Sequence, residues 1–115
     1  MQQDSLTSFN ALSKTFAVAT TTTGSTPVRI TKLKSNEHQE LRQYYVVNAS
    51  AGFLFFTLNN DDTTAAALPA DASSALGYML PPNSAGTFGG PPEAYFSGDL
   101  STGTGSAYVC GGSGR

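Results

Sequence analysis

The residues that most often carry out chemistry in proteins are few in this chain, and they do not cluster along it. The 115 residues include one histidine, His38, which lies in a polar segment directly after Glu37. Nucleophilic catalysis needs an activated nucleophile with a base beside it, and the Gly-x-Ser-x-Gly elbow of hydrolases is absent from the sequence. A metal site needs several His, Cys, Asp or Glu ligands. We therefore expect no catalytic residue, no metal site, no cofactor and no enzymatic activity.

Two short segments share residue types with ligand-binding motifs but lack the spacing of those motifs. Residues 59–62 read Asn-Asn-Asp-Asp, without the alternating ligands and the distant glutamate of a calcium loop. Residues 103–105 read Gly-Thr-Gly, without the third glycine and the strand–turn–helix context of a nucleotide-binding loop. We interpret both segments as turns between strands.

The cysteine content excludes an intrachain disulfide, because Cys110 is the only cysteine of the sequence. Its neighbours are Val109 and Gly111, and no histidine lies near it in the sequence. We expect a free, partly buried thiol that packs as a small apolar side chain.

Charge and hydropathy exclude two further classes of partner. Charged residues make up 12% of the chain and the net charge is −2, whereas a nucleic-acid surface needs clustered Lys and Arg. The N-terminus has no basic and apolar regions of a signal peptide, and no stretch approaches the roughly 20 apolar residues of a membrane span. We expect a protein made in the cytoplasm that binds neither nucleic acid nor membrane, and whose low-charge surface suits contact with other proteins.

The elements that this chain offers are short strands separated by turn residues. Residues 14–22 alternate apolar and polar side chains around Phe16 and Val18, which is typical of a half-buried strand. Similar runs recur at fairly even spacing, and we expect seven strands, at residues 14–22, 28–31, 41–48, 53–58, 77–80, 93–97 and 106–110. Such spacing, with frequent turns, predicts an all-β fold: a single domain that is a small antiparallel β-sandwich or jelly-roll-like barrel.

Three hairpins are expected from the turns between these strands. Residues 14–22 and 28–31 form the first, residues 41–48 and 53–58 the second, and residues 94–99 and 107–110 a terminal one. The alternation predicts a core made of Phe16, Val18, Val28, Ile30, Tyr45, Val47, Phe53, Phe55, Met79, Phe96 and Val109. Because residues 53–58 are apolar on both faces, we also expect a homo-oligomer, with a trimer favoured.

Two segments without a strand pattern are the candidate contacts with a partner. The first is residues 1–12, an extended N-terminal arm that carries Leu6, Phe9 and Leu12. The second is residues 83–92, a Gly- and Pro-rich loop that carries Phe88 between two pairs of prolines. Large apolar side chains are seldom left in solvent, and we expect both segments to dock on a neighbouring protein.

From residue 41 onward, the order of features resembles that of small β-rich virion proteins of tailed phages, in particular capsid decoration (cement) proteins. The resemblance lies in a strand that ends in Asn48, an apolar strand at residues 53–58, an Ala/Thr/Asp stretch at residues 61–75, and a strand and proline-containing loop at residues 78–82. An aromatic strand at Tyr95–Phe96, a Gly/Thr turn and a final Tyr-Val strand that ends in glycines complete it.

This resemblance implies a structural component of the virion that binds the major capsid protein, bridges neighbouring capsomers and needs no active site. A tail, neck or fibre component of the same particle is the first alternative. A carbohydrate-binding β-sandwich with an exposed aromatic platform is an alternative from another class.

Overall fold

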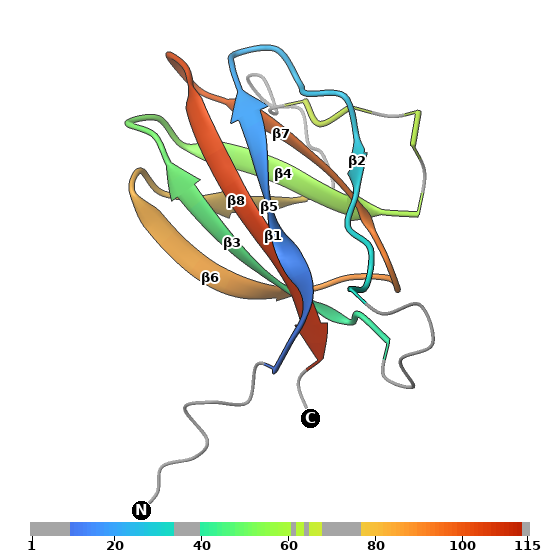
Figure 1. Ribbon diagram of the computed structural model, residues 1–115. Helices are drawn as coiled ribbons and strands as arrows, with labels where there is room; N and C mark the ends of the chain where they lie inside the picture. Colours follow the sequence, from blue (N-terminus) through green and yellow to red (C-terminus); the bar gives the residue numbers. More distant parts are fainter. Residues whose placement is uncertain (1–9, 34–39, 61, 64, 68–76, 114–115) are drawn as a thin grey trace, which may run out of the picture.

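The described part of the chain, in this computed structural model, is built from strands and contains no helix. It comprises residues 10–33, 40–60, 62–63, 65–67 and 77–113. Eight strands follow one another along these residues (Figure 1). They are β1 (Asn10–Thr20), β2 (Val28–Arg29), β3 (Gln43–Ala49), β4 (Leu54–Asn59), β5 (Tyr78–Leu80), β6 (Ser84–Gly89), β7 (Tyr95–Leu100) and β8 (Gly105–Ser113). No membrane-spanning helix occurs among the described residues.

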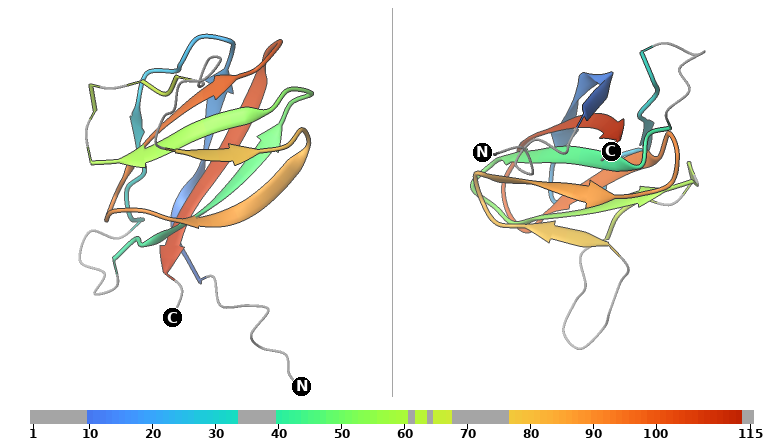
Figure 2. Two further views of the ribbon diagram at one scale, coloured as in Figure 1. Left: turned by 180° about the vertical axis from the view of Figure 1, so that it is seen from behind. Right: turned by 90° about the horizontal axis from the view of Figure 1, so that it is seen from below.

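The strands form two four-stranded antiparallel sheets that pack as two layers (Figure 2). Sheet A has the order β1-β8-β3-β6, and sheet B has the order β2-β7-β4-β5. The first four strands thus pair with the last four in reverse order: β1 with β8, β2 with β7, β3 with β6 and β4 with β5. An antiparallel ribbon rolled up in this way is a jelly roll. The expected sandwich or jelly-roll-like fold is therefore confirmed.

The three expected hairpins are wrong, because the two strands of each lie in different sheets. β1, β3 and β8 belong to sheet A, whereas β2, β4 and β7 belong to sheet B. The turns at residues 50–53 and 101–104 reverse the chain as expected, and Gly103 supplies the left-handed φ of 73° that a side chain would disfavour. Turn residues in a sequence predict only that the chain reverses its direction there. Whether the returning strand pairs or crosses the sandwich depends on where its apolar face finds a partner.

Residues 83–92 are not the expected loop, since residues 84–89 form β6, while docking of this segment on a partner stays a prediction. This strand pairs with β3 along its whole length, from Asn48↔Ser84 to Gln43↔Gly89. Its sequence, Ser-Ala-Gly-Thr-Phe-Gly, has few of the β-branched and aromatic residues that reveal a strand. At the edge of sheet A, backbone pairing on one side is enough to hold it. Asn83, with φ of 52°, makes the turn that leads into β6.

The core lies between the two sheets and is filled by large aromatic and aliphatic side chains. Phe56 is at its centre, in an edge-on contact with Phe88 at 4.9 Å between ring centroids and a tilted contact with Phe96 at 5.4 Å. Tyr44, Ile30, Leu41, Leu54 and Leu100 are all buried around it. Val18, Ile30, Phe96 and Val109 are buried as expected, and Phe16 and Val28 pack against this cluster.

Five of the expected core residues point outward instead, and one of them, Phe55, is nevertheless buried. Tyr45, Phe53 and Met79 are exposed, and Val47 is half-buried on the outer face of sheet A. In Tyr44-Tyr45-Val46-Val47, both phases of the alternation are equally apolar, and the structure buries Tyr44 and Val46. A one-residue change of phase exchanges the two faces of a strand, so this run could not be oriented from its own pattern.

The N-terminal boundary of the sandwich also differs from the expectation. β1 begins at Asn10 rather than at Lys14, and backbone pairing joins Asn10 to Ser113 of β8. The side chain of Leu12 packs against the core. The register of β1 shifts between Ala11 and Thr15, and this irregularity interrupts the alternation that would have shown the strand. Leu6 and Phe9 lie outside the described residues.

Tyr44 fixes the turn between β6 and β7 with its hydroxyl group. The hydroxyl donates a hydrogen bond to the carbonyl oxygen of Pro91 at 2.5 Å and accepts one from the N–H of Ala94 at 2.9 Å. Burial raises the pKa of Tyr44 above its ordinary value, although the bond from Ala94 acts in the opposite direction. The ring fills the core while the hydroxyl satisfies two backbone groups that would otherwise lack partners.

Asn48 fixes the opposite end of β3 in a similar way. Its side-chain NH₂ donates to the carbonyl oxygens of Gly52, Leu80 and Pro81, and its carbonyl oxygen accepts from the Ser50 hydroxyl. One buried amide thereby joins the β3–β4 turn to the end of β5. Asn48 also begins an Asn-Ala-Ser sequence of the type that accepts glycans, but in the folded chain its NH₂ group is buried and engaged.

Candidate binding surface

The outer face of sheet A is a regular surface of exposed and half-buried side chains. Each of its four strands contributes the side chains that alternate with the core residues. They are Thr15, Ala17 and Ala19 from β1; Ser106, Tyr108 and Cys110 from β8; Gln43, Tyr45, Val47 and Ala49 from β3; and Ala85 and Thr87 from β6. We call this surface the tyrosine face. None of its side chains is charged.

Tyr45 and Tyr108 lie together near the middle of the tyrosine face. Tyr45 is opposite Cys110, and Tyr108 is two residues before Cys110 on the same strand. They are therefore diagonal neighbours on adjacent strands, a relationship that separates Cα atoms by about 7–8 Å. Their exposed fractions are 42% and 40%. The pair forms an aromatic centre surrounded by alanine, valine and threonine side chains.

Two ion pairs involve residues that are not part of the tyrosine face. Arg29 contacts Glu93 at 3.2 Å, and its guanidinium group lies 5.8 Å from the ring centre of Tyr95. Arg42 contacts Glu40 at 3.1 Å in the segment that precedes β3. The first pair joins β2 to the β6–β7 turn, and the second lies within the segment that precedes β3. They leave the tyrosine face neutral.

The outer face of sheet B, by contrast, is covered at β7 by the chain's own loops, whereas Phe53 and Met79 on the same face stay exposed. Ser25 pairs with Gly98 of β7 through two hydrogen bonds of 2.9 Å. The Ser97 hydroxyl donates to the carbonyl oxygen of Ser25 and accepts from the N–H of Ala66. Ser97 is consequently buried although its side chain points away from the core, and Asp99 and Phe55 on the same face are buried as well. The two outer faces thus differ, because loops cover sheet B at β7 whereas the described chain leaves the middle of sheet A open.

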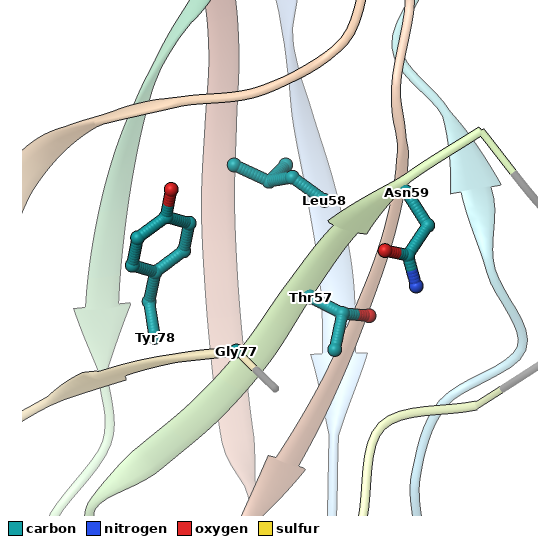
Figure 3. A pocket seen from close by; sticks show the side chains of 5 residues that line it. All are labelled: Thr57, Leu58, Asn59, Gly77 and Tyr78. Carbon is teal, nitrogen blue, oxygen red and sulfur yellow. The ribbon is translucent and has the colours of Figure 1, made fainter. Parts of the chain in front are cut away.

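One pocket lies beside β4. It has a volume of about 310 Å³ and is lined by Thr57, Leu58, Asn59, Gly77 and Tyr78, which come from β4 and the start of β5 (Figure 3). Leu58 and Tyr78 point toward each other, whereas Thr57 and Asn59 point away on the other side of β4 (Figure 3). The side chains on this wall are a phenol, a hydroxyl, an amide and an aliphatic group. They include no base next to a nucleophile.

A second pocket, of about 240 Å³, has a mixed lining of basic and apolar side chains. Lys14, Phe16, Thr31, Lys32 and Leu33 surround it, between the start of β1 and the segment after β2. Phe16 belongs to the set that packs against the core, and the N–H of Leu33 donates to the carbonyl oxygen of Leu12 at 2.8 Å. This pocket therefore lies where β1 packs against the segment that follows β2.

The reactive residue types remain apart in the described ranges. Cys110 is half-buried on the tyrosine face, with its sulfur 3.5 Å from the carbonyl oxygen of Ser13. No three His, Cys, Asp or Glu side chains within the described residues are close enough to hold a metal ion. His38 lies outside these residues. In the part of the chain that the structure describes, we find no base beside a nucleophile. What this part offers a partner is the contact surface of the tyrosine face.

Of the four residues expected to contact a partner, the structure describes two. Leu12 and Phe88 lie on β1 and β6, and both pack against the core. They are not the solvent-exposed anchors on which that expectation was based. Leu6 and Phe9 lie outside the described residues, and docking by residues 1–12 stays a prediction. The residues that the sequence did not single out are Tyr45 and Tyr108, which only the register of β3 against β8 brings together.

Comparison with known proteins finds no matching family model, no similar curated protein and no similar solved structure. Any function must therefore be argued from the surface itself and from the resemblance in the sequence pattern.

Proposed function

We propose that this protein is a structural component of a phage virion, a capsid decoration protein that docks on the major capsid protein through its tyrosine face. The observation that carries the proposal is the contrast between the two sheets. Loops of the chain bind to the outer side of β7 in sheet B, whereas all four strands of sheet A present a neutral outer face with two exposed tyrosines. The role is one of binding and needs no active site.

The fold is compatible with this role. Jelly rolls of eight strands occur in viral capsid domains, but also in lectins and cupins, and fold alone does not assign function. The resemblance of residues 41–115 to small virion proteins selects the first of these uses. Tyrosine is enriched at protein interfaces, where its ring adds buried area and its hydroxyl stays hydrogen-bonded.

The lack of charge on the tyrosine face indicates what kind of protein surface it can bind. A neutral face gains little from electrostatic attraction, so its partner must be flat and of low charge where they meet. Four strands spaced about 4.8 Å apart, overlapping over about six residues, span on the order of 400 Å² in projection. That is a modest interface for one copy. Many copies on a closed lattice would nevertheless stabilise it, because each binds only the assembled state.

The test is rebinding to particles from which the protein has been removed. Tyr108→Lys places a charge at the centre of the tyrosine face, and we expect at least a tenfold loss of affinity, since an unpaired charge would be buried. Ala65→Lys is the matched control, because Ala65 is exposed on a loop at the sheet B side. Equal rebinding of both variants would contradict the proposal.

The number of copies per particle distinguishes a position on the capsid from the alternative position in the tail, neck or fibre. Mass spectrometry of purified virions with quantified peptides gives this value directly. Hundreds of copies per particle support a capsid role, and a dozen or fewer indicate the tail.

A second function, carbohydrate binding, is favoured by one observation, the adjacent exposed rings of Tyr45 and Tyr108. Aromatic faces stack on sugar rings, and the neighbouring Thr15, Thr87 and Gln43 offer neutral hydrogen-bonding groups. A glycan array and a titration of the tyrosine resonances test this function. Binding that is lost in Tyr45→Ala but kept in Tyr45→Phe would support it over protein docking.

A further inference from the structure

The free edge of β1 is an uncharged backbone edge that ends at a basic pocket. β1 is the first strand in the order β1-β8-β3-β6, so β8 occupies one of its sides (Figure 1). Among the described residues, no strand pairs with the other side. Because hydrogen-bonding directions alternate along an antiparallel strand, about half of residues 15–20 direct their N–H and C=O groups away from β8. These groups can bind the backbone of an added strand.

Residues 15–20 lack the protection that edge strands usually have. Charged side chains, prolines and bulges commonly block such edges. In β1, Lys14 and the shift of register after Ala11 come before this stretch. The stretch itself reads Thr-Phe-Ala-Val-Ala-Thr, without charge or proline, and its register against β8 is regular throughout. The edge is therefore regular enough to pair along its length.

The second pocket, of about 240 Å³, lies at the Lys14 end of this edge. Lys14 and Phe16 line it from β1, and residues 31–33 line it from the segment after β2. The N–H of Leu33 donates to the carbonyl oxygen of Leu12 at 2.8 Å, which places this segment beside the start of β1. Leu33 is 62% exposed. A strand added along the edge would bring its last side chains to both lysines and both apolar residues of the pocket.

Charge distinguishes this pocket from the rest of the described surface. Arg29 and Arg42 form the two ion pairs described above, whereas Lys14 and Lys32 line the pocket, and the described lining contains no acidic residue. Glu93 accepts a hydrogen bond from the backbone N–H of Lys32 at 3.0 Å, and its other carboxylate oxygen contacts Arg29. In a chain with a net charge of −2, the pocket is a local positive region that favours a carboxylate ligand.

We propose that the free edge of β1 binds an extended segment of a partner protein by strand addition, and that this segment carries an acidic residue where it enters the second pocket. We call residues 15–20 together with this pocket the β1 edge site. In antiparallel addition, the acidic side chain lies opposite Lys14, and a large apolar side chain two positions before it lies opposite Phe16. Backbone pairing provides the affinity, and the pocket provides the specificity for these two side chains.

Two other occupants fit this site less well. A second copy that offers its own β1 edge would bring residues 20–23, which are all threonine, to each basic pocket, and residues 10–27 contain no acidic side chain. The chain's own residues 1–9 are too short to cover the whole edge. From Asn10 to Thr20, β1 runs along β8 from Ser113 to Gly105, a length of about 26 Å. Nine residues span at most about 30 Å, and part of that length is needed to reverse the chain.

The first test is a titration of the full chain with the heptapeptide Val-Thr-Val-Thr-Leu-Thr-Asp, blocked at both ends, followed by amide chemical shifts. We expect a Kd on the order of 0.1–1 mM, and about fivefold weaker binding of the same peptide ending in Lys. Lys14→Glu should weaken the Asp peptide and strengthen the Lys peptide. Ala65→Glu, an equal change at an exposed position on the sheet B side, should alter neither. No binding up to about 5 mM, or binding that is independent of the terminal charge, would overturn the proposal.

The same titration shows where the peptide binds and what it displaces. The largest shifts should lie within residues 14–20 and 31–33, and shifts centred on β5, on β6 or on the tyrosine face would contradict strand addition at β1. Asp4→Lys should leave the affinity unchanged, whereas a tenfold gain would show that the chain's own residues 1–9 occupy the site. Ultracentrifugation should find no dimer that the peptide dissociates, because such a dimer would make a second copy the occupant. Since these experiments do not involve the particle, failure here leaves the docking of the tyrosine face unaffected.

Discussion

Removing one oxygen atom from Tyr44 should destabilise the whole sandwich. In Tyr44→Phe the ring still fills the core, so the change affects only the two hydrogen bonds of the hydroxyl. A net hydrogen bond contributes about 1 kcal/mol, and a buried donor left without a partner costs about 1–3 kcal/mol. Ala94 is fully buried, so its N–H has no access to water in the variant. We expect a loss of about 2–4 kcal/mol.

The adjacent residue supplies the control. Tyr45→Phe removes the same atom one position along the same strand, but from a side chain on the open tyrosine face. We expect a change within about 0.5 kcal/mol. Urea unfolding followed by tyrosine fluorescence or circular dichroism measures both values, and the thermal midpoints should differ by on the order of 10 °C. If the two variants lose equal stability, the Tyr44 hydroxyl does not anchor the β6–β7 turn and the account of that turn is wrong.

Three further outcomes can be measured on the same material. Phe55→Ala should cost about 3–5 kcal/mol because Phe55 is only 4% exposed, whereas Phe53→Ala, on the same face but exposed, should cost less than about 1 kcal/mol in urea unfolding. Asn48→Asp should cost about 3 kcal/mol or more at neutral pH, since a carboxylate would face three carbonyl oxygens, and acidification should restore part of the loss. The raised pKa of Tyr44 means that the folded state holds its proton longer than the unfolded state. Its contribution to stability should therefore be complete below about pH 10 and decline above it, and the alkaline decline should be smaller in Tyr44→Phe.

The class of fold was predictable because it depends on features that neighbouring residues determine. The alternation around Val18 and Ile30 and the turns between the runs indicate strands wherever they occur. Topology was not predictable, because a turn such as residues 101–104 looks the same whether the next strand pairs or crosses to the other sheet. Because Tyr44 and Tyr45 are identical neighbours, the sequence likewise does not show which of the two side chains faces the core.

The candidate surface depends on register, which the sequence does not contain. Tyr45 and Tyr108 are 63 positions apart, from the difference of their numbers in the sequence, and only the pairing of β3 with β8 makes them neighbours. β6 was missed for a related reason: Ser84–Gly89 is a strand because β3 pairs with it along its length, although its residues have low strand preference. A sequence shows which residues favour a strand by their own preference. It shows less clearly which residues form a strand only because another strand pairs with them.

The central claim is that the tyrosine face is covered by another protein in the virion, and Cys110 allows a direct measurement. Its thiol is half-buried between Tyr45 and Thr15 in the middle of that face. The rate of maleimide labelling is measured for the free protein and for intact particles, with Ala65→Cys as a control thiol on the sheet B side. We expect labelling of Cys110 to slow at least tenfold on particles while the control thiol reacts at its free rate. Labelling of Cys110 at equal rates in both states would contradict the claim.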